Sequence, residues 1–475
     1  MELTGKKATI VGLARSGVGA ARLLDLMGAA VTVTDIRDEK ALADSVKLLP
    51  SSVRLCLGSH PDEIFNDADL IVVSPGVPLA IRPLADARAR GKRVIGELEL
   101  AFQIIETRLA ELRTIPFFAI TGSNGKSTTT TLLNHMMTKA GIRTLFGGNI
   151  GNALTEEIYK TATGSADMPD AVVAEISSFQ LEAIESFQPH VAAILNITPD
   201  HLDRYSSMKE YAEAKAGIFM NQQPADILVL NADDEGTMRL YDERLRSSEK
   251  APYVCFFSRK KKVEGVYLEG GSVFANLRHL DSGDLNAEII RADEIRINGV
   301  HNLENAMAAS AMALLANCPL DAVKESLREF AGLEHRLELV REINGVRYIN
   351  DSKGTNVGAV LKSIESFDSP IILIAGGRDK AGDFSALRKL VSEKVKMAVL
   401  IGEAADKIEK AIAGAARTEK ASDLKDAVEI ACRNAVSGDV VLLSPACASF
   451  DMFADFEDRG RQFREIALRL EACVA

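Results

Sequence analysis

The chain has 475 residues, of which 47% are hydrophobic and 26% are charged, and its formal net charge is −11. This is the composition of a globular protein, and the length suggests roughly three domains of about 150 residues each. The acidic balance argues against a broad basic face for nucleic acid, and no apolar run reaches the ~18 residues of a membrane span.

The amino terminus and the cysteines favour a cytoplasmic location. Glu2 comes early, and Gly12 and Arg15 interrupt the apolar run that follows, so we predict no signal peptide. The six cysteines are scattered and form no Cys-x-x-Cys pair, which is typical of reduced thiols that pack as small apolar residues.

Residues 1–96 alternate short apolar runs with helical stretches, which predicts a parallel sheet. The first turn, "VGLARSGVGAA", is rich in glycine and precedes a strand that ends at Asp35. Such a turn lets a diphosphate approach the amino terminus of a helix. The spacing Gly12, Gly17, Gly19 is not the Gly-x-Gly-x-x-Gly of an NAD site. Either a different ligand or a tight turn without a ligand is therefore expected.

A second segment, residues 97–332, contains the loop "GSNGKST" after the strand-like run "TIPFFAI". A strict phosphate-binding loop has four residues between its first glycine and its Gly-Lys pair, whereas here two residues separate Gly122 from Gly125. If the loop binds a nucleotide, its amides surround the phosphates, Lys126 neutralises their charge and the Ser127 hydroxyl reaches Mg²⁺. A chance match is the alternative at this point.

Three more side chains of this segment are candidates for the same site. Glu175 lies in an otherwise apolar strand; a buried carboxylate without a partner is costly, so it indicates a cation, with a satisfied core glutamate as the alternative. His201 belongs to the polar cluster "TPDHLDR" at a strand end, downstream of the loop, as site histidines often do. Lys215, in "YAEAKAGIF", would by default be an ordinary surface lysine.

The rest of this segment changes character. Residues 252–298 are rich in alternating β formers, which predicts an antiparallel addition to a parallel core. The stretch "HNLENAMAA" then returns to helix. Helix capping explains Asn302, whereas a second amide one turn later, at Asn305, is less expected.

A third segment, residues 333–475, repeats the alternation of buried strands and helices. Asn344-Gly345 stands between two strand-like runs and predicts a hairpin. Several polar clusters follow strands or open helices here, among them "NDSKGTN" and "LSPACASFDMF". Because ligands bind at the ends of parallel strands, we expect a second half-site in this segment.

Taken together, the motifs resemble those of the Mur ligases of bacterial peptidoglycan synthesis. The motifs are "GSNGKST", "EISSFQLE", "NITPDHLDRY", "YAEAKAGIF", "GVHNLENAMAA", "EHRLE", "NDSKGTN" and "LSPACASFDMF". They run in family order over essentially the whole chain. The resemblance implies an α/β fold of three domains: a Rossmann-like N-terminal domain for a UDP-sugar (1–96), a central phosphate-loop ATPase domain with a mostly parallel sheet (97–332), and a Rossmann-like C-terminal domain for an amino acid (333–475).

The resemblance also implies an activity, and it is strongest for the branch of the family that adds D-glutamate. The expected enzyme is a cytoplasmic monomer that uses ATP to join D-glutamate to UDP-N-acetylmuramoyl-L-alanine through an acyl phosphate. Two Mg²⁺ ions and a carbamylated Lys215 are expected with it. We also expect the last domain to swing about a hinge near Gly332, which would keep water from the acyl phosphate.

Site residues carry over from the family position by position. ATP would be bound by Gly122, Ser123, Asn124, Gly125, Lys126, Ser127, Thr128, Asn302, Asn305, Arg336 and Asp351. The metal ligands would be Ser127, Glu175, His201 and Lys215, and the catalytic residues Lys126, Glu175, His201 and Lys215. The UDP-substrate would contact Arg15, Ser16, Asp35, Asn149, Ser177, Gln180 and His201. D-Glutamate would be held by Thr355, Lys380, Ser449 and Phe456.

One stretch departs from the family pattern. In "GGRDKAGDF", Arg378 and Asp379 stand where the family has an acidic residue followed by glycine. The departure bears on the turn that presents Lys380.

Three other interpretations compete with this one. Another enzyme of the superfamily, such as folylpolyglutamate synthase, would share the motifs, but "SPGVP" in the first domain favours a UDP-sugar over a folate. An NAD-dependent oxidoreductase would need a different glycine spacing and no phosphate loop. A non-catalytic nucleotide-binding regulator would not need Lys126, Glu175, His201 and Lys215 together.

Overall fold

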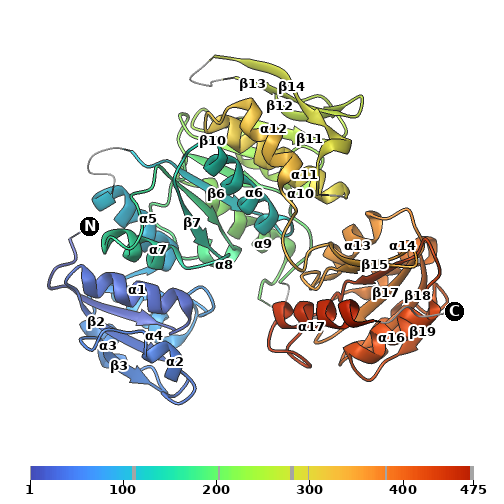
Figure 1. Cartoon of the computed structure of the whole chain (residues 1–475). Helices are drawn as coiled ribbons and strands as arrows, with labels where there is room; N and C mark the ends of the chain where they lie inside the picture. The colour runs from blue at the N-terminus through green and yellow to red at the C-terminus, as the bar shows by residue number, and fades with distance from the viewer. Residues whose placement is uncertain are drawn as a thin grey trace.

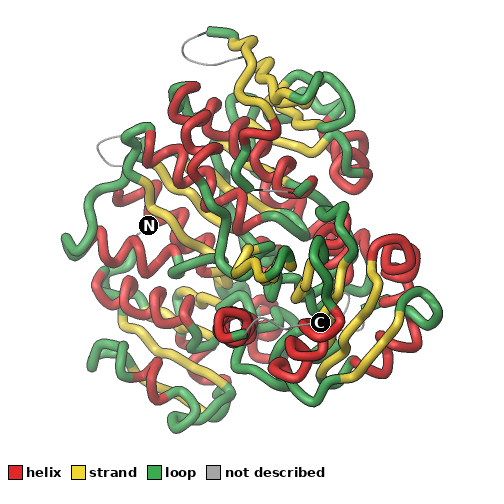
Figure 2. The backbone as a smooth tube through the Cα atoms, turned by 45° about the vertical axis from the view of Figure 1, so that its right-hand side comes forward, coloured by secondary structure: helices red, strands yellow, loops and turns green. Residues whose placement is uncertain are grey.

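The computed structural model describes residues 2–109, 114–201, 204–278, 283–297, 299–379 and 382–470. These residues form three lobes, each built on its own β-sheet (Figure 1). A view turned by 45° shows helices lying against the sheets of all three lobes (Figure 2). The predicted α/β fold with mostly parallel sheets is therefore confirmed, while the boundaries at 96/97 and 332/333 stay predictions.

The N-terminal sheet has five parallel strands in the order β3-β2-β1-β4-β5, the 3-2-1-4-5 order of a Rossmann-like half. Its elements are β1 (Lys7–Val11), α1 (Arg15–Leu26), β2 (Ala30–Asp35), α2 (Ala43–Val46), β3 (Arg54–Leu57), α3 (Asp62–Asp67), β4 (Leu70–Val73), α4 (Arg82–Ala89) and β5 (Arg93–Gly96). The glycine-rich turn joins β1 to α1. A Cβ at Gly17 would lie 2.0 Å from the carbonyl oxygen of Gly12, so the close packing of the turn itself requires glycine there.

The central sheet has nine strands in the order β14-β13-β12-β11-β10-β9-β6-β8-β7. Its strands are β6 (Phe117–Thr121), β7 (Thr144–Gly148), β8 (Ala171–Glu175), β9 (Val191–Ile194), β10 (Ile227–Asn231), β11 (Tyr253–Ser258), β12 (Gly265–Glu269), β13 (Ser272–Leu277) and β14 (Leu285–Arg291). The α-helices of this region are α5 (Glu97–Ile104), α6 (Lys126–Lys139), α7 (Leu154–Ala162), α8 (Ser178–Leu181), α9 (Met208–Ala216), α10 (Glu235–Leu240), α11 (Val300–Leu315) and α12 (Leu320–Glu329).

The predicted antiparallel addition to this sheet is present but begins later than expected. β12 pairs antiparallel with β13, and β13 with β14. β11, in contrast, runs parallel to both β10 and β12. Alternation of apolar residues does not distinguish parallel from antiparallel pairing, which is why the sequence pattern placed β11 in the antiparallel part.

The C-terminal sheet has six strands in the order β15-β16-β20-β17-β18-β19. Its elements are β15 (Glu338–Ile343), β16 (Val346–Asn350), α13 (Val357–Glu365), β17 (Ile371–Gly376), α14 (Arg388–Lys394), β18 (Val395–Ile401), α15 (Ala405–Ala411), β19 (Arg417–Lys420), α16 (Leu424–Asn434), β20 (Val440–Leu443) and α17 (Phe456–Arg469). Counted from β17, the run β19-β18-β17-β20 has the Rossmann-like order 3-2-1-4. The predicted hairpin joins antiparallel β15 and β16, with φ values of 51° at Asn344 and 76° at Gly345.

The first two lobes share one hydrophobic core, and the third has its own. A single cluster of buried side chains runs from the N-terminal sheet through α5 and α7 to one face of the central sheet. α1 packs on α7, and the guanidinium of Arg22 lies 4.1 Å from the centre of the Tyr159 ring and 2.6 Å from the carboxylate of Glu156. The clusters of the C-terminal lobe contain only residues of that lobe.

The structure bears on two expectations from the sequence, the absence of membrane spans and the state of the cysteines. Within the described ranges, the helices lack the combination of length and apolar character that crossing a bilayer requires. Cys56, Cys255 and Cys318 are reduced thiols, as expected. Cys432, in contrast, is disulfide-bonded, which the expectation of reduced cysteines did not include.

Candidate active site

The candidate site lies at the carboxyl ends of three neighbouring strands of the central sheet. β6 stands between β8 and β9 and is parallel to both. The phosphate loop follows β6, Glu175 ends β8, and the polar segment that contains His201 follows β9. Because parallel strands end at the same edge, these three features converge, as the sequence pattern predicted.

The short Gly-x-x-Gly-Lys-Ser loop is held by the segment after β9. The N–H of Ser123 donates to the carbonyl of Asn196 at 3.0 Å, and the N–H of Asn124 donates to Asn196 Oδ1 at 2.8 Å. Gly125 has a φ of 87°, and α6 begins immediately after it. The loop is therefore an ordered turn from strand to helix despite its short spacing.

Gly125→Ala is expected to weaken nucleotide binding by about tenfold or more. A Cβ at this position would lie 2.2 Å from Asn305 Oδ1, and the positive φ disfavours any side chain. Calorimetric titration with ADP measures the effect. Gly141→Ala is the matched control, because Gly141 has a φ of 81° but no atom within 4 Å of its added Cβ. Equal ADP affinities for the two variants would contradict the prediction.

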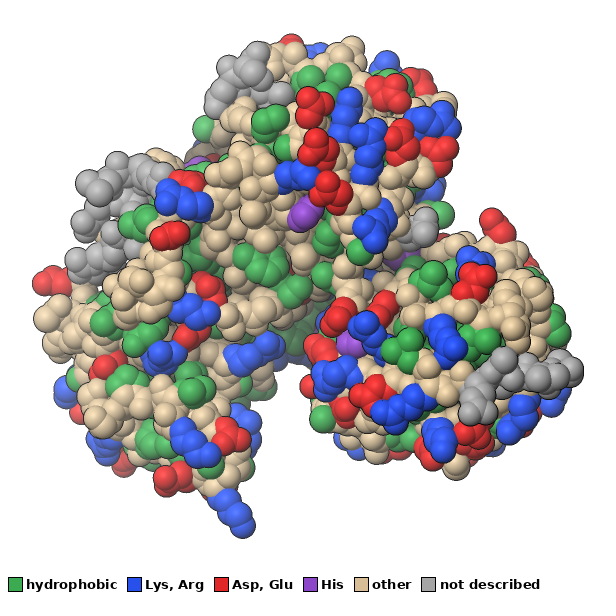
Figure 3. All heavy atoms as spheres, viewed as in Figure 1, with side chains coloured by type: hydrophobic (Ala, Val, Ile, Leu, Met, Phe, Trp, Pro, Cys, Tyr) green, Lys and Arg blue, Asp and Glu red, His purple; other side chains and the backbone are tan. Residues whose placement is uncertain are grey.

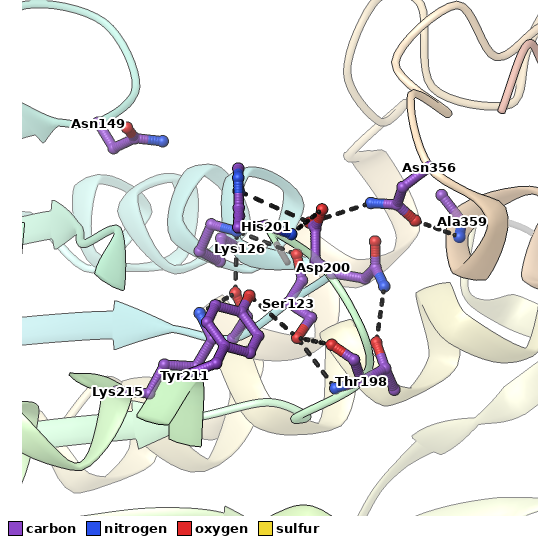
Figure 4. Close-up of polar contacts among 12 residues, drawn as sticks. Ser123, Lys126, Asn149, Thr198, Asp200, His201, Tyr211, Lys215, Asn356 and Ala359 are labelled. Carbon is purple, nitrogen blue, oxygen red and sulfur yellow. Dashed lines mark hydrogen bonds and ion pairs between the residues drawn. The ribbon is translucent and has the colours of Figure 1, made fainter. Parts of the chain in front are cut away.

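Two lysines converge on one carbonyl of the loop (Figure 4). Lys126 Nζ and Lys215 Nζ each donate to the carbonyl oxygen of Gly122 at 2.9 Å. Lys215 is only 1% exposed, so it is not the surface lysine that its sequence context suggested. Burial, and next the positive charge of Lys126, hold the pKa of Lys215 well below its usual range. Burial also lowers the pKa of Lys126, although the carboxylates of Glu175 and Asp200 oppose this.

Glu175 is a buried carboxylate whose second oxygen is available to a cation. Its Oε1 accepts a hydrogen bond of 2.6 Å from Asn149 Nδ2. Its Oε2 is buried and has no hydrogen-bond partner among the described residues. Such an oxygen is costly without a positive partner, and it lines the same cavity as Ser127, so the pair fits Mg²⁺.

The protein supplies few further metal ligands here. Among the residues that the structure describes, no group of three or more His, Cys, Asp and Glu side chains is arranged to hold a metal ion. Ser127 and Glu175 would therefore hold Mg²⁺ together with nucleotide oxygens, as phosphate-loop sites do.

His201 and Lys215 both lie near the ring of Tyr211. The ring of Tyr211 is centred 6.3 Å from the His201 ring and 4.5 Å from Lys215 Nζ. His201 Nε2 is 3.7 Å from Asp200 Oδ2, and its ring contacts Phe179 edge-on. The structure thus brings His201 and Lys215 to one region, with Tyr211 next to both.

A cavity of about 460 Å³ opens where the three domains meet. Figure 3 shows the corresponding hollow between the N-terminal and C-terminal lobes, below the central lobe. Its walls include Arg15 from the first domain, Ser127, Asn149 and Glu175 from the second, and Arg336, Lys353, Phe456 and Arg461 from the third. The cavity brings predicted metal, UDP-substrate and amino-acid residues together.

A second cavity, of about 370 Å³, is also lined by Arg336. Asn124, Gly125, Asn305 and Asp351 line it, together with Arg336 and Lys353, which also line the first cavity. Burial lowers the pKa of Arg336 and raises that of Asp351, whose Oδ2 accepts hydrogen bonds from two serine hydroxyls. Five of the predicted ATP residues, Asn124, Gly125, Asn305, Arg336 and Asp351, thus line one cavity next to the phosphate loop. Thr128 and Asn302 line a third hollow beside Arg336.

Other predicted residues are engaged within the protein. Ser177 and Gln180 form a capping box at the start of α8. Burial raises the pKa of Asp35, but hydrogen bonds from Arg37 and from the N–H of Leu13 outweigh burial and hold that pKa at about 2. Most of the predicted UDP-substrate and D-glutamate contacts that the structure describes line neither of the first two cavities: Ser16, Asp35, Ser177, Gln180, His201, Thr355 and Ser449.

Lys380 lies outside the described residues, and its role stays a prediction. The two preceding residues, which depart from the family pattern, form contacts of their own. Asp379 Oδ1 accepts a hydrogen bond of 2.9 Å from the N–H of Gly382, and Arg378 forms an ion pair of 3.1 Å with Glu403. Arg378 and Asp379 are thus both engaged in contacts with other residues of the C-terminal domain.

Two residues of the site, Lys353 and Tyr211, lie within the sequence motifs but were not among the predicted site residues. Lys353, within "NDSKGTN", lines both cavities, and its Nζ lies 3.8 Å from the centre of the Phe456 ring. Burial, and next the charge of Arg336, lower the pKa of Lys353 to about 8. Tyr211, within "YAEAKAGIF", contacts Lys215. Lys353 could have been found from the sequence, because it follows the end of a buried strand, β16, by three residues.

The fold and the converging strand ends define a three-lobed α/β protein with a phosphate-loop-like turn at the edge of its central sheet. Comparison with known proteins gives the family. Three family models match along the chain: "Mur ligase MurD-like, N-terminal domain" at residues 6–96, "Mur ligase middle domain" at 120–313 and "Mur ligase, glutamate ligase domain" at 335–447. The chain belongs to the Mur ligase family.

Curated relatives of similar sequence share one name within the family. A UDP-N-acetylmuramoylalanine--D-glutamate ligase of Geotalea uraniireducens is 46% identical over 99% of each chain. The protein of that name from Clostridioides difficile is 43% identical over 98% of this chain and 99% of its own. Among solved structures, a MurF ligase of Thermotoga maritima in complex with ADP has a TM-score of 0.60 at 15% identity, over 99% of both chains. That likeness concerns the fold.

Proposed function

We propose that this protein is an ATP-dependent ligase that joins D-glutamate to UDP-N-acetylmuramoyl-L-alanine, giving ADP and phosphate, in peptidoglycan precursor synthesis. The observation that carries the proposal is the cavity between the three domains. It combines the phosphate-loop Ser127 and the buried Glu175 with basic side chains from the first and third domains. The relatives of the same length that carry this name support the choice of amino acid.

The chemistry explains why three domains must meet at one place. A carboxylate does not condense with an amine at neutral pH, because oxide is a very poor leaving group. Transfer of the γ-phosphoryl group of ATP to the carboxylate gives an acyl phosphate and ADP. The amine of D-glutamate then attacks the acyl carbon, the amine loses a proton, and inorganic phosphate leaves. Nucleotide, carboxylate and amine must therefore occupy one water-poor space.

The residues of the cavity suit these steps. Lys126 would leave the Gly122 carbonyl for the β and γ phosphates. Arg336 lines both cavities, so it could stabilise charge that moves from ATP to the acyl group. Ser127 and Glu175 would hold Mg²⁺, which when bound neutralises charge between nucleotide and carboxylate. The proposal also includes a second metal ion, held by His201 and by a carbamate on Lys215. It further includes a monomeric state and a cytoplasmic location.

Phosphate release should depend on D-glutamate. With ATP, Mg²⁺ and UDP-N-acetylmuramoyl-L-alanine, we expect release at least ~100-fold faster with D-glutamate than with L-glutamate, L-alanine or a diamino acid, because a site that fixes both carboxylates of one enantiomer leaves charged groups unpaired with the others. A coupled phosphate assay measures this. Preference for L-alanine or a diamino acid would assign the chain to a different branch of the family.

A further inference from the structure

A hydrogen bond between the central and C-terminal domains joins residues 156 positions apart in the chain. Asn356 Nδ2 donates to Asp200 Oδ2 at 3.2 Å (Figure 4). Asp200 lies in the segment after β9, next to His201, and Asn356 directly precedes α13. The bond therefore connects the phosphate-loop edge of the central sheet to the first turn of a helix in the C-terminal domain.

On the central side, Asp200 belongs to a segment fastened to the phosphate loop. Ser123 Oγ donates to the carbonyl of Thr198 at 2.8 Å and accepts from the N–H of Thr198 at 3.0 Å. Asn124 Nδ2 donates to Thr198 Oγ1 at 3.3 Å. Asp200 itself accepts the N–H of His201 at 2.9 Å through its other oxygen, Oδ1. The carboxylate is thus held by backbone that the loop positions.

On the C-terminal side, the side-chain amide of Asn356 forms two hydrogen bonds. Asn356 Oδ1 accepts the N–H of Ala359 at 2.8 Å and caps α13, which leaves Nδ2 for Asp200. The helix start lies against the loop: a Cβ at Gly358 would be 3.7 Å from Asn124 Nδ2 and 3.8 Å from Thr198 Oγ1, which is ordinary van der Waals contact. Gly358, Asn124 and Thr198 all line the cavity of about 370 Å³.

We propose that Asn356 is a positioning residue whose hydrogen bond to Asp200 holds the C-terminal domain against the phosphate loop during ligation. The inference rests on the proposed function, because the C-terminal domain brings the amino acid in that scheme. Loss of the bond then affects kcat and the KM for D-glutamate more than the affinity for ADP, since the phosphate loop itself stays intact.

A reciprocal exchange of side chains tests the bond without disturbing the helix. Asn356→Asp keeps an equally good cap for α13 but replaces the donor by an oxygen that faces Asp200. Asp200→Asn in the same chain restores the bond in reverse, because an amide at position 200 donates to the carboxylate at position 356. Asp200→Asn alone is the reference for the double variant: its amide oxygen still accepts from Asn356, and it measures what loss of the carboxylate beside His201 does by itself.

We expect Asn356→Asp to lower kcat/KM for D-glutamate by about tenfold or more, as losing a hydrogen bond to a charged group does. ADP affinity and melting temperature should remain close to those of the unaltered protein, and the double variant should recover most of the loss. Unchanged kinetics for Asn356→Asp, or a double variant no better than the single one, would overturn the proposal.

Small-angle scattering with ADP gives a second measurement that needs no turnover. Asn356→Asp should be more extended than the unaltered protein and the double variant, and three identical profiles would count against the bond. Should Asn356→Asp prove unstable, Asn356→Ser retains a cap, is too short to reach Asp200, and should give the same extended profile. Failure of the unaltered enzyme to release phosphate with D-glutamate would contradict the proposed function, while the scattering comparison would still decide the role of Asn356.

Discussion

Lys215→Ala is expected to lower the rate of amide formation by roughly 1,000-fold. Lys215 is buried, its amine touches the phosphate loop at the Gly122 carbonyl, and burial beside Lys126 lowers its pKa. A cation there would repel Mg²⁺, whereas a neutral amine can add to CO₂, lose a proton and become a carbamate anion. In the proposed mechanism, removal of that anion would take away a metal ligand close to the developing charge, where such groups have their largest effects.

Rescue distinguishes the carbamate from a structural role for Lys215. A short carboxylic acid such as acetate or formate should partly restore the Lys215→Ala variant, because its carboxylate replaces the missing anion. Lys209→Ala, an exposed lysine on the same helix, is the control and should keep full activity. A fully active Lys215→Ala variant, with no response to acetate, would refute the carbamate.

Lys126→Ala should reduce ATP turnover by at least ~100-fold. Lys126 Nζ lies inside the loop, 2.9 Å from the carbonyl of Gly122 and 3.1 Å from that of Ser123, within reach of the phosphates that the loop would surround. Alanine removes the only side-chain charge that the loop itself contributes to the β and γ phosphates.

The measurement for Lys126→Ala is ADP formation under saturating substrates, compared with calorimetric binding of the UDP-substrate. Binding of the UDP-substrate should be retained, since its expected contacts do not include Lys126. Lys139→Ala is the matched control, because Lys139 is on the same helix but forms surface ion pairs with Glu325 and Glu329. An ADP rate equal to that of the unaltered enzyme would remove the phosphate-loop interpretation.

The sequence predicts the sheets and strand ends well because these are local properties. Runs such as "FFAIT" and "AVVAE" are short, apolar and followed by polar or glycine-rich turns, so both the parallel sheet and the edge at which ligands bind follow from them. Glu175 was recognisable for the same reason, as a charge in an apolar strand.

Burial and contacts that depend on segments far apart in the chain could not be predicted from local sequence patterns. The burial of Lys215 arises from the packing of α9 beneath the phosphate loop, and its own sequence context suggested exposure. Lys353 lines two cavities because the C-terminal domain meets the central one, and Asn356 reaches Asp200 across 156 positions. Such contacts need the tertiary arrangement, or the likeness to a known family, before they can be assigned.

The shared core of the first two domains has a consequence for unfolding. One buried cluster contains side chains of both domains, and its members range from Leu3 to Leu245. In addition, the carboxylate of Glu97 accepts hydrogen bonds from the N–H and the hydroxyl of Thr155. Domains joined through a common core lose their structure together, whereas a domain with a separate core melts independently. Calorimetry of this three-domain chain should therefore resolve two cooperative transitions, and the smaller one should belong to the C-terminal domain.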